Sequence, residues 1–197
     1  MDKERFERQI EFILEADKMK NVLRQTHLSG HGRRENDAEH AWHMALMTYL
    51  LREYSNEPID VSKAMIMVLI HDMVEIDAGD TYAYDKNGHT SKKEREAIAA
   101  ERIFGLLPED QKKELYALFE EFELGETAEA RFARAMDNFQ PLLLNHSNGG
   151  SDWKDRGINI NQVMGRHCNT KFGSAEIWDY AKVIIDEHFE QRTIEKE

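Results

Sequence analysis

The sequence lacks most of the features that would place a protein in a membrane or in an oxidising compartment. Cys168 is its only cysteine, so no disulfide can form within the chain and a reducing compartment fits. No apolar run approaches the ~20 residues that span a bilayer. The charged start Met1–Arg5 is not followed by the apolar segment of a signal peptide. We therefore expect a cytoplasmic protein that makes no membrane contact.

The sequence also lacks an excess of positive charge. It carries 26 Lys and Arg against 38 Asp and Glu, a net charge of −12. This balance argues against nucleic acid as a main partner and disfavours an anionic substrate at long range. Screening limits that field to about 10 Å at ordinary salt. A phosphate-binding site would therefore need its own local cations.

A period-two alternation of polar and apolar residues persists nowhere, so no β-strand is expected. Apolar residues instead recur at helical spacing, as in the first amphipathic helix around residues 6–14. The 197 residues suit one all-α domain over 1–197, with a C-terminal helix at about 174–190 packing on the core. Between them, helices are expected over 36–51, 61–75, 92–106, 109–123 and 127–145. An exposed loop is expected over 82–90.

The dipeptide His71-Asp72 stands at the end of an unbroken apolar run that begins at Ala64. A helix that is apolar all round is a buried helix. An ionised carboxylate buried without a partner costs several kcal/mol, so such a group is normally paired or coordinates a metal. An imidazole beside the carboxylate suggests a cation held by both side chains.

Two further residues of ligand type lie on other predicted helices. His40 falls in the second turn of the helix that Asn36 caps, with Glu39 placed as in a capping box. Asp137 lies in an apolar-rich helix, away from any charged stripe. The chain thus offers two imidazoles and two carboxylates on three helices: His40, His71, Asp72 and Asp137.

With these residues in place, the sequence resembles the HD-domain metal-dependent phosphohydrolases, and most of all the branch containing 5′-deoxynucleotidases. Two segments carry the resemblance, Glu39-His40 and His71–Asp80, over a match of roughly residues 6–189. The resemblance implies a single-domain helical bundle with the metal site between core helices. It also implies release of phosphate from (deoxy)nucleoside 5′-monophosphates by a metal-activated water, which would make the protein a phosphoric monoester hydrolase.

The same resemblance implies roles for individual residues. One divalent ion would be bound by His40, His71, Asp72 and Asp137. Mn²⁺, Co²⁺, Fe²⁺, Zn²⁺ and Ni²⁺ are not distinguished, since no thiolate narrows the choice. Glu75 would serve the attacking water or the leaving oxygen as acid or base. Asp80 would be the second catalytic carboxylate.

Arginines near the first ligand helix are candidates for substrate binding. Arg24 corresponds to an arginine that engages phosphate in bacterial deoxynucleotidase relatives, and Gln25 stands where those relatives place a tryptophan beside the sugar. Selectivity between ribose and deoxyribose therefore stays open. Arg33 and Arg34 are further candidates for phosphate contacts. All three arginines could instead be solvated surface residues.

Other functions also stay open. Another HD phosphohydrolase activity, on a nucleoside triphosphate, a cyclic nucleotide or an alarmone, would use the same ligands. A non-catalytic, metal-containing ligand-binding module is a third option, against which the presence of Glu75 and Asp80 argues. A zinc protease is disfavoured because residues 39–43 lack the His-Glu-x-x-His order. The oligomeric state is open, with a homodimer as one option.

The candidates also have purely structural interpretations. His71-Asp72 would then be a hydrogen-bonded core pair, and Asp137 an acceptor for a buried N–H group. Glu75 would be a surface acid at a helix end, and Asp80 a turn residue. Pro141, four residues after Asp137, predicts either a bend beside this ligand or the end of its helix.

Overall fold

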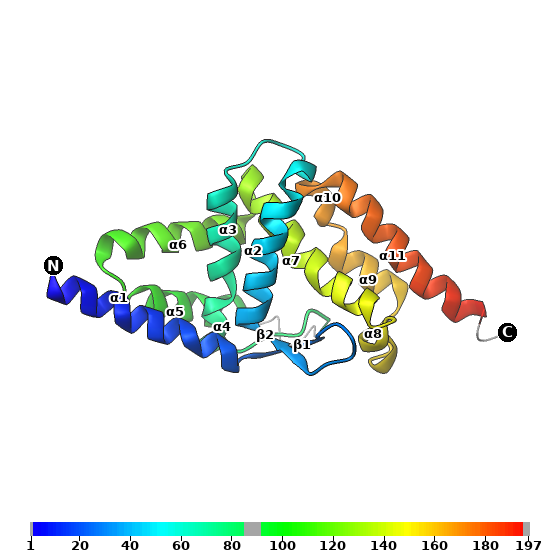
Figure 1. Ribbon diagram of the computed structural model, residues 1–197, viewed down its shortest axis with the longest axis horizontal. Coiled ribbons are helices and arrows are strands. Elements are labelled where there is room, and N and C mark those ends of the chain that lie inside the picture. Colours follow the sequence, from blue (N-terminus) through cyan, green and yellow to red (C-terminus); the bar gives the residue numbers. More distant parts are fainter. Residues whose placement is uncertain (1, 85–91, 195–197) are drawn as a thin grey trace.

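The computed structural model describes residues 2–84 and 92–194, with side chains as far as residue 189. Helices dominate it, and the predicted all-α class is confirmed (Figure 1). The longer helices are α1 (Lys3–Ala16), α2 (Asp37–Leu51), α3 (Val61–Ile70), α5 (Lys92–Phe104), α6 (Glu109–Leu124), α7 (Ala128–Ser147), α9 (Ile160–His167) and α11 (Ala175–Ile194). Shorter helical segments are η1 (Asp17–Asn21), η2 (Arg52–Tyr54), η3 (His71–Val74), α4 (Glu75–Ala78), α8 (Ser151–Asp155) and α10 (Thr170–Gly173). The division into one domain over 1–197 stays a prediction.

A small antiparallel hairpin precedes α2, so the expectation of no strand was wrong. It pairs β1 (Leu23–His27) with β2 (Arg34–Asn36). Strands this short, with a register irregularity between them, leave no lasting period-two pattern in the sequence. The connecting loop turns through Gly30 and His31, whose φ angles are 74° and 57°. The hairpin brings β1 alongside α7.

The helix expected over 61–75 is interrupted just before its functional residues. The α-helix α3 ends at Ile70, and His71–Val74 form the 3₁₀ turn η3. The four-residue helix α4 then begins at Glu75 and ends before Gly79, whose φ of 74° favours glycine. The predicted single helix is therefore wrong in this part. Of the loop expected over 82–90, residues 83–84 form a turn and 85–90 lie outside the described residues.

Helix α7 runs through the middle of the molecule and packs against α2, α3, α6, α9 and α11 (Figure 1). Thr127 caps it by accepting a hydrogen bond from the Ala130 N–H at 3.2 Å. It continues through Pro141 to Ser147, so Pro141 does not end the helix. The bend expected at Pro141 stays a prediction.

The remaining helices gather at the two ends of the long axis. α1, α5 and α6 lie at one end, and α9 and α11 lie at the other, beyond α7 (Figure 1). Apolar residues of α11, among them Ile177, Ile184 and Ile185, join the core around α7. In the described part of the chain, no helix is both long enough and apolar enough to cross a bilayer.

Candidate metal centre and cavity

The four predicted ligands converge from α2, η3 and α7. His40 Nε2 lies 3.3 Å from Asp137 Oδ1 and 3.8 Å from Asp72 Oδ2. His71 Nε2 lies 3.0 Å from Asp72 Oδ2 and 3.7 Å from Asp137 Oδ1. Both imidazoles are buried, and their ring centroids are 5.7 Å apart. The structure thus brings together residues that lie 97 positions apart in the sequence.

The orientation of the two imidazoles fits a divalent cation. His40 Nδ1 is held by Gln140 Oε1 at 2.9 Å, and His71 Nδ1 donates to the Val68 carbonyl at 2.9 Å. Both Nε2 atoms therefore face the carboxylates. Ligand atoms of His40, His71 and Asp72 all lie within 4.8 Å of one another. This donor set suits a divalent metal ion.

The electrostatics of the cluster also call for a cation. Burial alone would lower the pKa of His71, but the carboxylates of Asp72 and Asp137 outweigh it and raise that pKa well above its ordinary value. Burial alone would raise the pKa of Asp137, but His40 and His71 lower it well below its usual range. A divalent ion would replace the protons that these buried imidazoles otherwise carry.

Gln140 supports His40 and was not singled out from the sequence. Fully buried on α7, it donates through Nε2 to Glu35 Oε1 at 2.7 Å and lies 3.1 Å from His43 Nδ1. Its Oε1 accepts from His40 Nδ1. The amide therefore fixes the tautomer that leaves His40 Nε2 free for a metal. A glutamine three residues after Asp137 carries no signal of this role in the sequence.

The Arg24 side chain is only 13% exposed and lines the cavity, which excludes its interpretation as a solvated surface arginine. Its Nη1 lies 2.6 Å from Asp72 Oδ2 and 3.2 Å from Asp37 Oδ1. Burial would lower the pKa of Arg24, but the surrounding carboxylates, Asp72 first, raise it. Asp37, another residue that the sequence analysis missed, is fully buried, and burial together with Asp72 raises its pKa to about 7.

Glu75 and Asp80 face the same cavity from either side of α4. Glu75 is buried, and burial together with the neighbouring Asp72 raises its pKa well above the ordinary value. Burial also raises the pKa of Asp80. Within the described residues, Glu75 Oε2 and Asp80 Oδ2 have no hydrogen-bond partner. The placement of Glu75 inside the molecule excludes its interpretation as a surface acid.

Oxygen atoms of Asp37, Asp72 and Glu75 form a second group within 4.8 Å of one another. Arg24 Nη1 contacts both Asp37 and Asp72, so the guanidinium already supplies positive charge to this group. Here the protein's own cation offsets the carboxylates, whereas in the imidazole cluster the positive charge would come from protons on the histidines or from a bound divalent ion.

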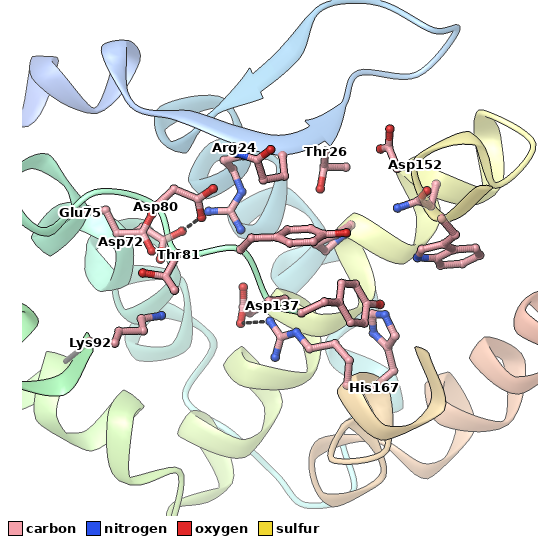
Figure 2. A pocket seen from close by; sticks show the side chains of 18 residues that line it. Arg24, Thr26, Asp72, Glu75, Asp80, Thr81, Lys92, Asp137, Asp152 and His167 are labelled. Carbon is pink, nitrogen blue, oxygen red and sulfur yellow. Dashed lines mark hydrogen bonds and ion pairs between the residues drawn. The ribbon is translucent and has the colours of Figure 1, made fainter. Parts of the chain in front are cut away.

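The cavity beside the cluster encloses about 180 Å³ and extends well beyond it. Figure 2 shows Asp72, Glu75, Asp80 and Lys92 on one side and Asp152 and His167 on the other, with Asp137 between them. Along α7, the lining residues Asp137, Pro141 and Asn145 recur every four positions. One face of α7 therefore forms the floor of the cavity.

Residues 16–178 match the family model described as HD domain. The chain belongs to the HD-domain family. The resemblance noted from the sequence is therefore confirmed. The chain is similar to a protein from Magnetospirillum magnetotacticum MS-1 whose crystal structure is known. The two are 47% identical with a TM-score of 0.89, and the match covers 93% of this chain and 92% of that one. That protein is described as a predicted metal-dependent phosphohydrolase.

Curated relatives of this HD-domain protein carry a more specific name. Human 5′-deoxynucleotidase HDDC2 is 34% identical over 111 residues, which cover 56% of this chain and 53% of that protein. The Dictyostelium discoideum 5′-deoxynucleotidase HDDC2 is 31% identical over 141 residues, which cover 68% of this chain and 74% of that protein. The chain spans about half the length of the human, bovine and mouse relatives it matches.

Two cations of the HD-domain cavity were not foreseen. Lys92 Nζ, at the start of α5, lies 3.2 Å from Glu96 Oε1. Arg166 Nη2, from α9, lies 3.6 Å from Asp137 Oδ2. Both residues come from helices that the sequence analysis did not connect with the site. An isolated Lys or Arg on a helix gives no sign that it will face a distant ligand cluster.

The other two predicted arginines lie elsewhere. Arg33 is exposed and forms an ion pair with Glu39, and Arg34 is exposed on β2. Neither lines the cavity. Gln25 does line it and accepts a hydrogen bond from Arg156 at 2.5 Å. Arg24 is therefore the one member of the predicted arginine set that the structure brings to the metal-type cluster.

Proposed function

We propose that this HD-domain protein is a metal-dependent phosphohydrolase that releases phosphate from nucleoside or deoxynucleoside 5′-monophosphates. One observation carries the proposal: the buried carboxyl group of Glu75 faces the same cavity as the cluster of two imidazoles and two carboxylates. The names of the relatives support the reaction and the substrate class. The alternative of a non-catalytic module gives no role to a buried acid in this position.

We propose that one divalent ion is bound by His40, His71, Asp72 and Asp137. When bound, the ion supplies a water of lowered pKa and offsets phosphoryl charge. A single ion is favoured because Arg24 already offsets the carboxylates of Asp37 and Asp72. The phosphate group of the substrate would lie among Arg24, Lys92 and Arg166, which supply the local positive charge that a chain of net charge −12 needs.

Glu75 is suited to the acid role. Because burial and Asp72 raise its pKa, the group holds a proton at higher pH than an ordinary glutamate. As water attacks phosphorus and the P–O5′ bond breaks, Glu75 would donate its proton to the leaving O5′. Asp80, whose pKa is raised less strongly, would accept a proton from the attacking water or orient it. Nucleoside and phosphate are then the two products.

The proposed setting is the cytoplasm, and the proposed partner is a small phosphate ester rather than nucleic acid. The single cysteine fits a reducing compartment. The positively charged side chains of the candidate site line the cavity. The net charge of the chain is −12, which disfavours attraction to nucleic acid.

The test is release of inorganic phosphate from a panel of nucleoside 5′-monophosphates, each with several divalent ions. Asp72→Ala should lose bound metal in elemental analysis of protein purified without chelator. Glu75→Gln should keep the metal and lose turnover by about 10²–10⁴-fold. Glu53→Gln, at an exposed position outside the cavity, is the matched control. Normal turnover by Glu75→Gln, or equal metal in Asp72→Ala and wild type, would contradict these assignments.

A further inference from the structure

The part of the cavity away from the metal-type cluster contains two buried acceptor atoms with no partner. His167 Nδ1 and Asn145 Oδ1 both belong to residues that line it, and neither atom has a hydrogen-bond partner among the described residues. The two residues are 4% and 7% exposed. A buried acceptor without a partner destabilises the folded protein, because it has lost its hydrogen bonds to water. Two of them in one cavity indicate a ligand with hydrogen-bond donors.

The length of the cavity fits this interpretation. Asn145 lies eight residues after Asp137 on the same face of α7. At 1.5 Å per residue, this separation is about 12 Å along the helix axis. The phosphate and the nucleoside of one nucleotide need a comparable separation between their binding groups. His167, from α9, lies on the side of the cavity opposite Asp72 and Glu75 (Figure 2).

His167 is suited to accept a hydrogen bond rather than to donate one here. Burial, with help from the neighbouring Arg166 charge, lowers its pKa to about 3, so the ring is neutral at physiological pH. Because Nδ1 has no hydrogen-bond partner among the described residues, we assign the hydrogen bond to the Asn138 backbone to the other ring nitrogen. In that tautomer Nδ1 presents a lone pair to the cavity.

Aromatic side chains line the same part of the cavity. Tyr84 and Trp153 both contribute to the wall, and Tyr84 accepts a hydrogen bond from Trp153. Tyr82 packs edge-on to Tyr84, with ring centroids 5.3 Å apart. The Arg156 guanidinium carbon lies over the Tyr82 ring, 4.5 Å from its centroid. Such rings provide flat surfaces for a planar heterocycle.

We propose that this part of the cavity binds the nucleoside, with His167 and Asn145 accepting hydrogen bonds from its N–H or O–H groups. The inference rests on the proposed function, because it assigns the nucleoside part of the proposed substrate. An amino group on the base offers two N–H donors, the kind of group that these acceptors lack. A base that presents a carbonyl oxygen there would place an acceptor against His167 Nδ1. The site should therefore favour dCMP over dUMP.

Kinetics and direct binding test this proposal with the metal-loaded full chain. Steady-state KM and kcat are measured for dCMP, dUMP, 2′,3′-dideoxycytidine 5′-monophosphate and p-nitrophenyl phosphate. The variants are His167→Phe, which removes the acceptor, and His167→Asn, whose amide oxygen lies near the position of Nδ1. Asn145→Leu provides a second, independent removal. Thermal denaturation confirms that each variant folds.

The expected result is that His167→Phe raises KM for dCMP roughly 3- to 10-fold relative to its effect on p-nitrophenyl phosphate. His167→Asn should recover most of that loss. If the donor is the base amino group, the preference for dCMP over dUMP collapses in His167→Phe. If it is the 3′-hydroxyl, the preference for dCMP over the dideoxy analogue collapses instead. Equal changes in KM for all four compounds would overturn the proposal.

Calorimetric binding of dCMP to the Glu75→Gln variant separates this inference from the proposed function. If wild type hydrolyses no nucleotide, the proposed function fails. Weaker binding of dCMP by Glu75→Gln combined with His167→Phe would still support the nucleoside site. If nucleotides are hydrolysed but both variants bind dCMP equally, the nucleoside site fails and the proposed function stands.

Discussion

Gln140 holds three buried groups at once, although it does not belong to the ligand set itself. Its amide joins His40, Glu35 and His43 at distances of 2.9, 2.7 and 3.1 Å. A side chain of this kind sets which histidine nitrogen faces the metal and raises the basicity of that ligand. The four proposed ligands alone therefore do not define the candidate centre, because the His40 ring is also held by this neighbour.

Replacing Gln140 by leucine should weaken metal binding by about 10–100-fold. The substitution removes the amide that bonds to both His40 Nδ1 and Glu35, and it frees the imidazole to rotate or change tautomer. Competition with a chelating dye measures the affinity. Gln111→Leu is the control, since Gln111 bonds to Gln9 and does not line the cavity. An unchanged affinity in Gln140→Leu would show that packing alone orients His40.

Two helical elements place their proposed ligands near a helix end, whereas Asp137 lies in the middle of α7. Helix α2 begins with a capping box in which Asn36 Oδ1 accepts from the Glu39 N–H at 2.9 Å and Glu39 Oε2 accepts from the Asn36 N–H at 3.2 Å. His40 follows directly. At the other ligand pair, the α-helix gives way to η3 at His71. A helix terminus leaves backbone N–H groups without partners inside the helix, and the Asn36 cap satisfies one of them at the start of α2.

Asn36→Ala should lower the free energy of unfolding by about 1 kcal/mol and should also weaken metal binding. The loss of the cap frays the first turn of α2, and His40 follows that turn directly. Asn159→Ala is the matched control, because Asn159 forms the same capping box with Gln162 at the start of α9. It should cost similar stability and leave the metal affinity unchanged. Urea unfolding and metal titration of both variants make the comparison. Equal metal affinity in the two variants would contradict the proposed role of the α2 cap.

At the scale of the whole molecule, the burial of titratable side chains makes the free energy of unfolding depend on pH. The pKa of buried His167 is lowered to about 3 in the folded protein. The unfolded chain takes up this proton below its ordinary pKa of about 6.5. Between these values the unfolded state binds more protons, so the contribution of His167 to stability is present above pH 6.5 and is lost as the pH falls.

Wild type should therefore lose about 1 kcal/mol more stability than His167→Phe when the pH is lowered from 6 to 5. Urea unfolding of both proteins at the two pH values, with chelator present throughout, gives the difference. Because His40 and His71 titrate in both proteins, their contributions cancel in the comparison. A parallel loss in the two proteins would show that His167 is protonated in the folded state.

The sequence by itself determined the family, the helical class and the metal-type residues. A His-Asp pair in an unbroken apolar run must be buried, and a buried carboxylate must be neutralised, so the chemistry followed from local pattern. The helix cap at Asn36 was predicted for the same reason, since a cap depends on near neighbours in the chain. Glu75 and Asp80 came from the spacing that the resemblance supplied.

Only the tertiary structure decided which other side chains join the site. Gln140 lies 100 residues from His40 along the chain, and Arg24 lies 48 from Asp72. Arg166 and His167 enter the cavity because α9 packs against α7. The break at His71 and the short hairpin likewise depend on packing. Periodicity records which face of a helix is buried, but the partner across that face depends on how the whole chain folds.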